Sequence, residues 1–378
     1  MSTERVALHR GLEGIEAAES KVCLIDGIKG QLSYRGYDIF PLAEHSTFEE
    51  TTYLLWHGDL PTRAQLEPFR ADLSAARRLS PEVSALVSKF PKTADPMDVL
   101  RSAVSCLGMY DPDVKSNDRQ ATVRKAIRLT AQIPTAVAAF HRTRRGLAPL
   151  EPKATLSHAA NFLYLLSGVE PDELSAHTFD VALILHADHG FNASTFAARV
   201  TASTLTDLHS CITSAIGTLK GPLHGGANEE VMRVLQEVGS ADHAASHIQK
   251  MLAEGKRIPG FGHRVYKTMD PRATVLKGLS ESLGQRGGNS ELFRLSTLIQ
   301  DIVMRDKKLN PNVDFYSASA YRYMGIELDL FTPVFAISRI AGWCAHVLEQ
   351  YADNRLIRPA EAYTGARDRK YVAISQRG

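Results

Sequence analysis

The chain has 378 residues, enough for one large domain or two of ordinary size. Lys and Arg (44) nearly balance Asp and Glu (42), and the net charge of +2 excludes a general polycation for nucleic acid. Hydrophobic residues make up 44%, as in a globular protein with a buried core, and the four scattered cysteines form no C-x-x-C pair that would signal a zinc site or a disulfide framework.

The N-terminal stretch MSTERVALHRGLEGIE has no apolar segment of the kind that a secretory signal needs. We therefore expect a cytoplasmic protein, which also fits cysteines kept in a reducing compartment. The longest apolar run, near 330–348, contains Arg339 at its centre, and this charge argues against a membrane span. We predict neither a membrane nor a nucleic acid as partner.

Helical patterns dominate the chain, so we predict an all-α protein. A short strand is expected at 31–34, and a capping box predicts a helix over 47–58. Apolar spacing predicts a helix over 155–166. Asn228 is expected to cap another helix, and the pair 332–333 to begin one, with Thr as the N-cap and Pro at the first helical position.

Turn-rich sequences interrupt the chain at 221–222, 284–289 and 310–312. The first and third of these breaks bracket a segment that we expect to move as a smaller domain.

The motif HADHGFNAST places His186, Asp188 and His189 together after an apolar run. Two histidines and a carboxylate at this spacing resemble a metal-ligand cluster. The alternative is a helix end whose histidines are only hydrogen-bonded. The residues that follow are glycines and hydroxyls rather than further ligands, so we expect no metal.

The motif GPLHGGANEEV places His224 in a glycine-proline turn before a predicted helix. The N-terminus of a helix carries partial positive charge and free N–H groups, which lower the pKa of a nearby imidazole. A neutral imidazole could then donate a hydrogen bond to a developing oxyanion. The alternative is a turn histidine without a catalytic role.

The stretch GFGHRVYKTMDPRA sets His263 directly after Gly260 and Gly262, with Lys267 and Arg272 nearby. Glycines allow a backbone to approach a ligand closely, and the cations suit a phosphate. The pattern is not a Walker loop, because no G-x-x-x-x-G-K-[ST] is present. The alternative is a solvated, charged surface.

The motif NPNVDFYS places Asp314 between two apolar residues. Burial raises the pKa of a carboxyl and makes its carboxylate a better base, whereas the alternative role is to cap a helix. Farther along, Arg339 lies within an apolar helix and needs an anionic partner. That partner is either a protein carboxylate or a substrate carboxylate bound through two hydrogen bonds.

Together, these histidines, the carboxylate and the arginines Arg272, Arg339 and Arg358 suit a small polyanion with a carbonyl group. The cations beside the glycines suit a phosphate-bearing partner that binds next to it. A base and oxyanion donors favour proton abstraction beside a carbonyl.

The motifs GPLHGGANEEV, PGFGHRVYKTMDPRA, NPNVDFYS, ISRIAGW and NRLIRPAEAYTG, in this order, resemble the citrate synthase family. The N-terminal GLEGIEAAESKVCLIDGIKGQLSYRGYDI does so too, and the resemblance covers about Gly11 to Gly365. It implies an all-helical homodimer, with a large domain at 1–220 and 327–378 and a smaller, mobile domain at 221–326.

The resemblance implies an enzyme that condenses acetyl-CoA with oxaloacetate and hydrolyses citryl-CoA, without a metal or a redox cofactor. It implies that Asp314 removes the methyl proton, that His224 stabilises the enol and that His263 polarises the ketone. The residues implied to hold oxaloacetate are His189, Arg272, Arg339 and, from the neighbouring subunit, Arg358.

Coenzyme A is part of the substrate, and Lys267 falls where the family places a cation for a CoA phosphate. The implied CoA contacts are Lys256, Arg257, Ile258, Gly260, Gly262, Lys267 and Lys307. One stretch would then serve both substrates, so its closure could bring them together.

Three other functions stay open at this point. A 2-methylcitrate synthase would use propionyl-CoA with the same catalytic residues, because one methylene is worth only about 1–3 kcal/mol in a pocket. A non-catalytic CoA-binding scaffold would not need Asp314. A metal-dependent hydrolase would use His186, Asp188, His189 and His224. Gly190 departs from the acid that many relatives carry after HADH.

Overall fold

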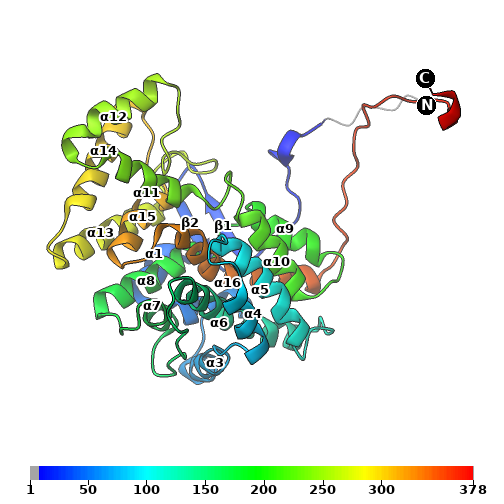
Figure 1. The fold of residues 1–378 in the computed structure, drawn as a ribbon, viewed down its shortest axis with the longest axis horizontal. Coiled ribbons are helices and arrows are strands. Elements are labelled where there is room, and N and C mark those ends of the chain that lie inside the picture. The colour runs from blue at the N-terminus through cyan, green and yellow to red at the C-terminus, as the bar shows by residue number, and fades with distance from the viewer. Residues whose placement is uncertain (1–7, 378) are drawn as a thin grey trace.

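The computed structural model describes residues 8–377. Sixteen α-helices dominate this part of the chain, together with one three-stranded sheet and three short 3-10 helices (Figure 1). The predicted all-α class is confirmed. The α-helices are α1 (Ile39–His45), α2 (Phe48–His57), α3 (Arg63–Ala75), α4 (Pro81–Lys89), α5 (Pro96–Tyr110), α6 (Arg119–Arg144), α7 (His158–Ser167), α8 (Glu173–His186), α9 (Ala193–Ala202), α10 (Leu208–Leu219), α11 (Ala227–Val238), α12 (Ala241–Ala253), α13 (Pro271–Arg286), α14 (Glu291–Lys307), α15 (Val313–Tyr323) and α16 (Phe331–Ala352).

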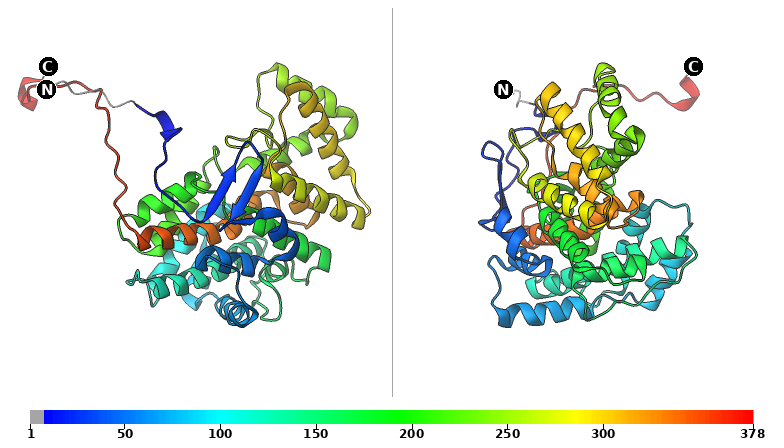
Figure 2. Two further views of the ribbon diagram at one scale, coloured as in Figure 1. Left: turned by 180° about the vertical axis from the view of Figure 1, so that it is seen from behind. Right: turned by 90° about the vertical axis from the view of Figure 1, so that its left-hand side faces the viewer.

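The sheet is a small antiparallel meander near the N-terminus, in the order β1 (Cys23–Asp26), β2 (Gln31–Tyr34) and β3 (Tyr37–Asp38). The strand expected at 31–34 is confirmed. The turn between β1 and β2 packs against the loop that carries His263, where Lys267 N donates to Gly27 O at 2.8 Å. The two views of Figure 2 show this hairpin beside that loop, so the sheet supports one wall of the site.

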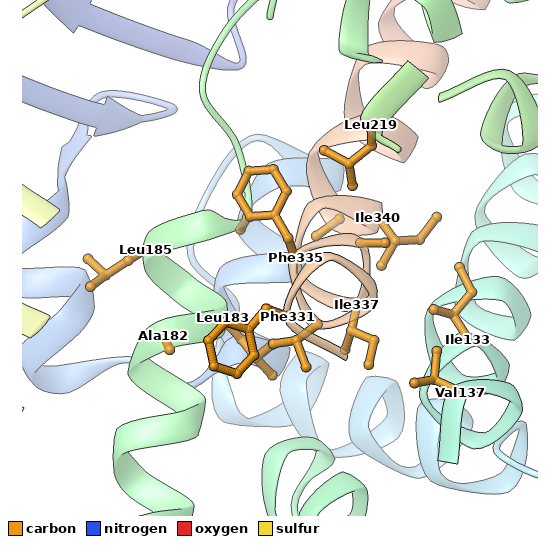
Figure 3. Close-up of a cluster of buried hydrophobic side chains, with 14 of the residues drawn as sticks. Ile133, Val137, Ala182, Leu183, Leu185, Leu219, Phe331, Phe335, Ile337 and Ile340 are labelled. Atoms are coloured by element: carbon orange, nitrogen blue, oxygen red, sulfur yellow. The ribbon is translucent and has the colours of Figure 1, made fainter. Parts of the chain in front are cut away.

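The core is built around α16, whose residues are nearly all buried. Figure 3 shows apolar side chains of α16 meeting those of α6, α8 and α10. Truncating one such buried phenylalanine to alanine typically costs about 3–5 kcal/mol of stability. The segment Leu328–Ala352 has the length and hydropathy of a membrane span, but its most apolar window lies entirely inside the protein. Its apolar character is therefore explained by the core.

Helices α11 to α15 pack mainly on one another and form a group at one end of the molecule (Figures 1 and 2). The remaining helices surround α16. Two chain segments connect these groups, one after α10 and one between α15 and α16. The domain limits 1–220, 221–326 and 327–378, and the mobility of the middle segment, stay predictions.

Residues 353–377 leave the body as an extended arm with one short 3-10 helix, Ile374–Gln376 (Figures 1 and 2). The N-terminal segment, with the 3-10 helix Arg10–Leu12, leaves in the same direction. Nearly all side chains of both segments are exposed.

The helix expected at 47–58 is confirmed, with Thr47 Oγ1 accepting the Glu50 N–H and Gly58 in the left-handed region at the C-cap. The predicted start of α7 at residue 155 is wrong, because Ser157 is the residue whose side chain accepts a first-turn N–H. The helix begins at His158 instead.

Two further predicted caps are wrong. The helix α11 has Gly226 as its N-cap, so Asn228 lies inside its first turn, fully buried. The helix α16 has Leu330 as its N-cap, because the 3-10 helix Leu328–Leu330 runs directly into it. Thr332 uses its hydroxyl elsewhere, to donate to Gly225 O at 3.3 Å in the loop that carries His224.

Candidate active site

The loop before α15 is joined to the loop that carries His263. Gly262 N donates to Asn310 O at 2.9 Å, and Asn312 N donates to Gly260 O at 2.8 Å. The Asn312 side chain also donates from Nδ2 to Gly262 O at 2.9 Å. This pairing fixes the first turn of α15 beside the glycine-rich loop, although the two segments are far apart in sequence.

Asp314 is the second residue of α15 and lies half-buried in that first turn. Asn312 is the N-cap, because its Oδ1 accepts the Asp314 N–H at 3.0 Å. The alternative role of Asp314 as a helix cap is therefore wrong. Burial raises the pKa of Asp314 to about 6, although the positive charge of Arg272 opposes this shift. The carboxylate is thus a stronger base than an exposed aspartate and still mostly ionised at neutral pH.

His263 is held by its own loop. Its Nδ1 accepts the backbone N–H groups of Val265 at 3.0 Å and Tyr266 at 3.1 Å. Because Nδ1 accepts, the neutral ring carries its proton on Nε2, which is left to donate. Burial and then the charge of Arg272 lower the pKa of His263 to about 4, so the ring is neutral at physiological pH.

His224 lies in the loop between α10 and α11, and it faces the N-terminus of α9. The Ser194 N–H donates to His224 Nε2 at 3.2 Å, and Ser194 Oγ lies 2.8 Å from the same nitrogen. A backbone N–H can only donate, so the neutral imidazole carries its proton on Nδ1. Burial, followed by the charge of Arg339, lowers the pKa of His224 to about 4. The ring therefore offers one N–H donor and no net charge.

His224 lies directly before α11, as predicted, and the first turn of α9 contacts its ring as well. Ser194 is itself fixed by Trp343, whose Nε1 donates to Ser194 Oγ at 3.1 Å, and by Asn192, whose Oδ1 accepts from that hydroxyl at 2.9 Å. The predicted neutral imidazole is thus present, but its pKa is lowered by burial and by Arg339, and its contact with α9 was not predicted.

His189 faces the same region from the end of α8. Its ring centroid lies 5.1 Å from that of His263, and its Nε2 lies 3.2 Å from Tyr266 Oη. Burial and the charge of Arg272 hold the pKa of His189 well below its usual value. The structure thus brings the two histidines together, with Tyr266 packed against both rings.

Arg272 occupies the second position of α13 and is only 3% exposed. Its Nε and Nη2 donate to the Asp270 carboxylate at 3.0 Å and 2.8 Å. Asp270 also accepts the Val313 N–H at 3.2 Å, which ties the start of α13 to the start of α15. Arg272 is therefore oriented by a protein carboxylate that also positions the helix of Asp314.

Arg339 is 1% exposed, and its guanidinium has no carboxylate oxygen within 4.0 Å in the part of the chain that the structure describes. Its Nε donates to His186 O at 2.7 Å, and the guanidinium carbon lies 4.6 Å from the Phe335 ring centre. The same ring stands edge-on to His224, with centroids 6.5 Å apart. A buried guanidinium without an acidic contact is a strong indication of an anionic ligand.

His186 does not join Asp188 and His189 in a metal site. Its Nδ1 lies 2.8 Å from Ala182 O within α8, and its ring packs edge-on to Phe335. Among residues 8–377, no three His, Cys, Asp or Glu side chains are grouped so as to hold a metal ion. Gly190 adopts φ +56°, and its N–H donates to Asp188 Oδ2 at 3.0 Å, so this turn after α8 uses the glycine.

The expected CoA contacts form a second, more exposed group. Gly260 and Gly262 have φ of +79° and +74°, and a Cβ on Gly260 would lie 2.7 Å from the Val231 side chain. Lys256 pairs with Glu254 at 2.7 Å, on the surface. Arg257, Lys267 and Lys307 are exposed, whereas Ile258 is buried.

Arg358 makes no contact with His224, His263, Asp314, Arg272 or Arg339 that the structure records. It is exposed at the start of the C-terminal arm, next to Ile357, whose N–H donates to Ser203 Oγ at 3.0 Å. Four residues that the sequence did not single out do contribute: Ser194, Tyr266, Asp270 and Phe335. Each belongs to or adjoins a quoted motif, but only the folded structure shows which side chain it contacts.

The family described as "Citrate synthase, C-terminal domain" matches residues 11–360 of the chain. A citrate synthase from Haloferax volcanii is 51% identical over 375 residues, which cover 98% of this chain and 99% of the relative. A 2-methylcitrate synthase from Shewanella oneidensis is 41% identical over 379 residues, and the match covers 100% of both chains.

A solved structure of citrate synthase from Thermoplasma acidophilum, a ternary complex with carboxymethyl coenzyme A and oxaloacetate, has a TM-score of 0.93 to this fold at 32% identity. The match covers 98% of this chain and 100% of that one. The sequence motifs, the helical fold and the full-length matches agree. The chain belongs to the citrate synthase family.

Proposed function

We propose that this chain condenses acetyl-CoA with oxaloacetate and hydrolyses the resulting citryl-CoA. The observation that carries the proposal is the buried Arg339, which has no carboxylate contact within residues 8–377 and whose charge acts on His224. The two imidazoles of the site, His224 and His263, each keep one N–H to donate. A dicarboxylate would supply the missing anion. A ketone and a thioester would accept the two N–H groups. The relative from Thermoplasma acidophilum binds oxaloacetate together with a CoA analogue, which supports this pairing.

In the first step, Asp314 removes a proton from the methyl group of acetyl-CoA. This proton is weakly acidic, so a carboxylate needs help at the carbonyl. The Nδ1–H of His224 donates to the thioester oxygen as negative charge develops there. One such donor is worth about 3–4 kcal/mol in comparable oxyanion sites. The raised pKa of Asp314 and the neutral state of His224 suit these roles.

In the second step, the enol carbon attacks the ketone carbon of oxaloacetate and a carbon–carbon bond forms. The ketone oxygen takes up the Nε2 proton of His263, and the proton that Asp314 removed in the first step leaves the carboxyl group and restores the neutral imidazole. His189, Arg272 and Arg339 hold the substrate carboxylates in line for this attack. Because these side chains are buried, their charges act in a region of low dielectric and are stronger than on the surface.

In the third step, water attacks the thioester carbon of citryl-CoA, and the C–S bond breaks to release citrate and the free thiol of CoA. Premature hydrolysis of acetyl-CoA would waste the substrate. We therefore propose that segment 221–326 closes over the substrates and excludes water during the first two steps. The connections after α10 and between α15 and α16 are the hinges of this motion.

Coenzyme A binds along the loop that precedes His263. The backbone from Ile258 to Gly262 lines the adenine, and the left-handed glycines allow this close approach. Lys256, Arg257, Lys267 and Lys307 supply positive charge for the phosphates. No metal ion or organic cofactor beyond the substrates takes part.

The active unit is a homodimer in which Arg358 reaches the site of the partner subunit. Its exposed position at the start of the C-terminal arm, where it is accessible to a second subunit, supports this assignment. The reaction takes place in the cytoplasm.

Release of free thiol from acetyl-CoA by the purified protein tests the proposal. We expect thiol release that requires oxaloacetate and that is unchanged by a metal chelator. Hydrolysis of acetyl-CoA without oxaloacetate, or the absence of any release, would contradict it.

A second candidate is 2-methylcitrate synthase activity, which the 41% identity to the Shewanella oneidensis enzyme favours. The test compares kcat/KM for propionyl-CoA and for acetyl-CoA with the same preparation. We expect acetyl-CoA to be the better substrate, and the opposite order would assign the methylcitrate activity.

A further inference from the structure

One face of α16 carries three residues one turn apart: Arg339, Gly342 and His346. Their spacing of three and four residues places them in a row along the helix. All three are buried, with Arg339 at 1% exposure and His346 at 0%. The row thus runs from the oxaloacetate-binding end of the site to a buried imidazole that the proposed chemistry does not use.

The turn after α8 lies on the middle of this row. Gly342 N donates to Ala187 O at 3.0 Å, and a Cβ on Gly342 would lie 2.4 Å from Asp188 Oδ1. The glycine is therefore required for the close approach of this turn. It places the Asp188 carboxylate over the helix, between Arg339 on one side and His346 on the other.

Asp188 is 0% exposed and contacts His346 rather than Arg339. The His346 Nε2 lies 3.2 Å from Asp188 Oδ1 and 3.3 Å from Oδ2. Oδ2 also accepts the Gly190 N–H, whereas Oδ1 accepts no hydrogen bond. The carboxylate is thus held by His346 and by the Gly190 N–H, and the thiol of Cys23 lies beside it.

Asp188 nevertheless acts on Arg339 through space. Burial lowers the pKa of Arg339, and Asp188 is the largest charge that opposes this shift. The carboxylate therefore compensates the buried guanidinium without contacting it, since no oxygen of Asp188 comes within 4.0 Å.

The imidazole of His346 is itself fixed from its far side. Glu349 Oε2 lies 3.9 Å from His346 Nδ1 and 2.7 Å from Nη1 of Arg199, which is also buried. Glu349 Oε1 accepts the Lys21 N–H at 2.8 Å, and Arg199 Nη1 lies 3.5 Å from His346 Nδ1. The Phe191 ring packs edge-on to His346 and lies under the Arg199 guanidinium. These contacts hold the ring where its Nε2 reaches Asp188.

We infer that His346 is a positioning residue for the dicarboxylate: it holds the Asp188 carboxylate away from Arg339, so that this guanidinium stays free for a substrate carboxylate. The inference rests on the proposed function of Arg339. Without His346, the charge that acts most strongly on the unpaired Asp188 would be that of Arg339, and an internal ion pair between the two would compete with the substrate. The apparent affinity for oxaloacetate then equals the intrinsic affinity multiplied by the fraction of molecules in which Arg339 is still free.

The test is the KM for oxaloacetate of His346→Met, which keeps the volume and loses the donor. If Asp188 forms an ion pair with Arg339 in about nine-tenths of the molecules, the KM for oxaloacetate rises about tenfold, while kcat stays nearly constant. The conservative variant His346→Gln can still donate to Asp188 and is expected to restore most of the affinity. Adding Asp188→Asn to His346→Met removes the competing charge and should lower KM again.

Controls separate positioning from general damage. His158→Met replaces another buried histidine, remote from the site, and should leave the oxaloacetate KM unchanged. If His346→Met does not fold, Glu349→Gln loosens the same imidazole at a partly exposed position and should raise KM about twofold.

An unchanged KM in His346→Met, or in Glu349→Gln where only that variant folds, overturns the inference. So does a double variant whose KM is as high as that of His346→Met alone. Wild-type thiol release is measured first, because its absence would refute the proposed function itself rather than the role of His346.

Discussion

The candidate site has one half that we propose binds the dicarboxylate and another that we propose binds coenzyme A. The two halves differ in the burial of their residues. The dicarboxylate half consists of side chains that are almost fully buried, with His189 at 9%, Arg272 at 3% and Arg339 at 1% exposure. The coenzyme half consists of a glycine-rich backbone and of cations such as Lys267 that are exposed. One half thus keeps its charges buried, whereas the other presents charge at the surface.

This difference has a physical consequence for recognition. Buried charges interact in a low dielectric and cannot be replaced by water, so each contact in the dicarboxylate half is strong and specific. Exposed charges are screened within about 8 Å at physiological ionic strength. The dicarboxylate half should therefore decide which small substrate reacts, and the coenzyme half should mainly strengthen the binding of a long, charged molecule.

Asp314 lies where the two halves meet, and its replacement should give the largest effect. Asp314→Asn keeps the shape of the side chain but removes the base, so we expect kcat to fall about 100- to 10,000-fold. The dissociation constant of oxaloacetate, measured by calorimetry, should change little.

A matched control is Asp180→Asn, which also removes a buried carboxylate, one that accepts the Phe48 N–H outside the site. We expect this variant to keep its kcat. Collapse of oxaloacetate binding in Asp314→Asn would show that the residue holds the dicarboxylate rather than acting as the base.

Arg339→Leu should affect the dicarboxylate half selectively. The loss of a buried ionic contact costs about 2 kcal/mol or more, which corresponds to a rise of about 30-fold or more in the oxaloacetate KM. The acetyl-CoA KM, measured at saturating oxaloacetate, should be nearly unchanged. Arg77→Leu serves as control, because Arg77 is another buried arginine and donates to Lys153 O away from the site. Equal effects of both substitutions on oxaloacetate would argue for general destabilisation.

The pH profile tests whether the junction contains one titrating base. The pKa of Asp314 is raised to about 6, while burial and a neighbouring arginine keep those of His224 and His263 at about 4. A base acts only when deprotonated, so kcat/KM should fall as pH decreases through about 6. The limiting slope should be about tenfold per pH unit, for one proton. If the limiting slope of kcat/KM against pH corresponded to two protons near pH 6, an imidazole would also have to lose a proton there.

The sequence could point to much of the buried half, because each residue that we propose as catalytic lies in a short motif with its own glycine or proline. The motifs identified His224, His263 and Asp314, but they left open whether Asp314 caps a helix. Asn312 two residues earlier is an equally good cap in sequence, and only the folded backbone shows that its side chain is the acceptor.

Contacts between distant segments explain what the sequence could not reveal. Asp188 and His346 are 158 positions apart in the sequence, and no motif or spacing in the sequence indicates that they are in contact. The same holds for Ser194 and His224, since the hydrogen-bond partner of this imidazole comes from α9, 30 residues earlier in the chain. Helix starts were missed for a local reason, because several polar residues near each start could serve as the cap.

Lys267→Met should give the smallest effect and tests the exposed half. An exposed charge contact is worth about 1 kcal/mol or less, so we expect the acetyl-CoA KM to rise about two- to fivefold, with the oxaloacetate KM unchanged. The rise should shrink at high ionic strength, because salt screens exposed charges. Arg264→Met makes the same change of charge three residues away, also at an exposed position, and is the matched control. If both variants behave alike, only the general positive charge of this loop attracts coenzyme A, and Lys267 has no contact of its own.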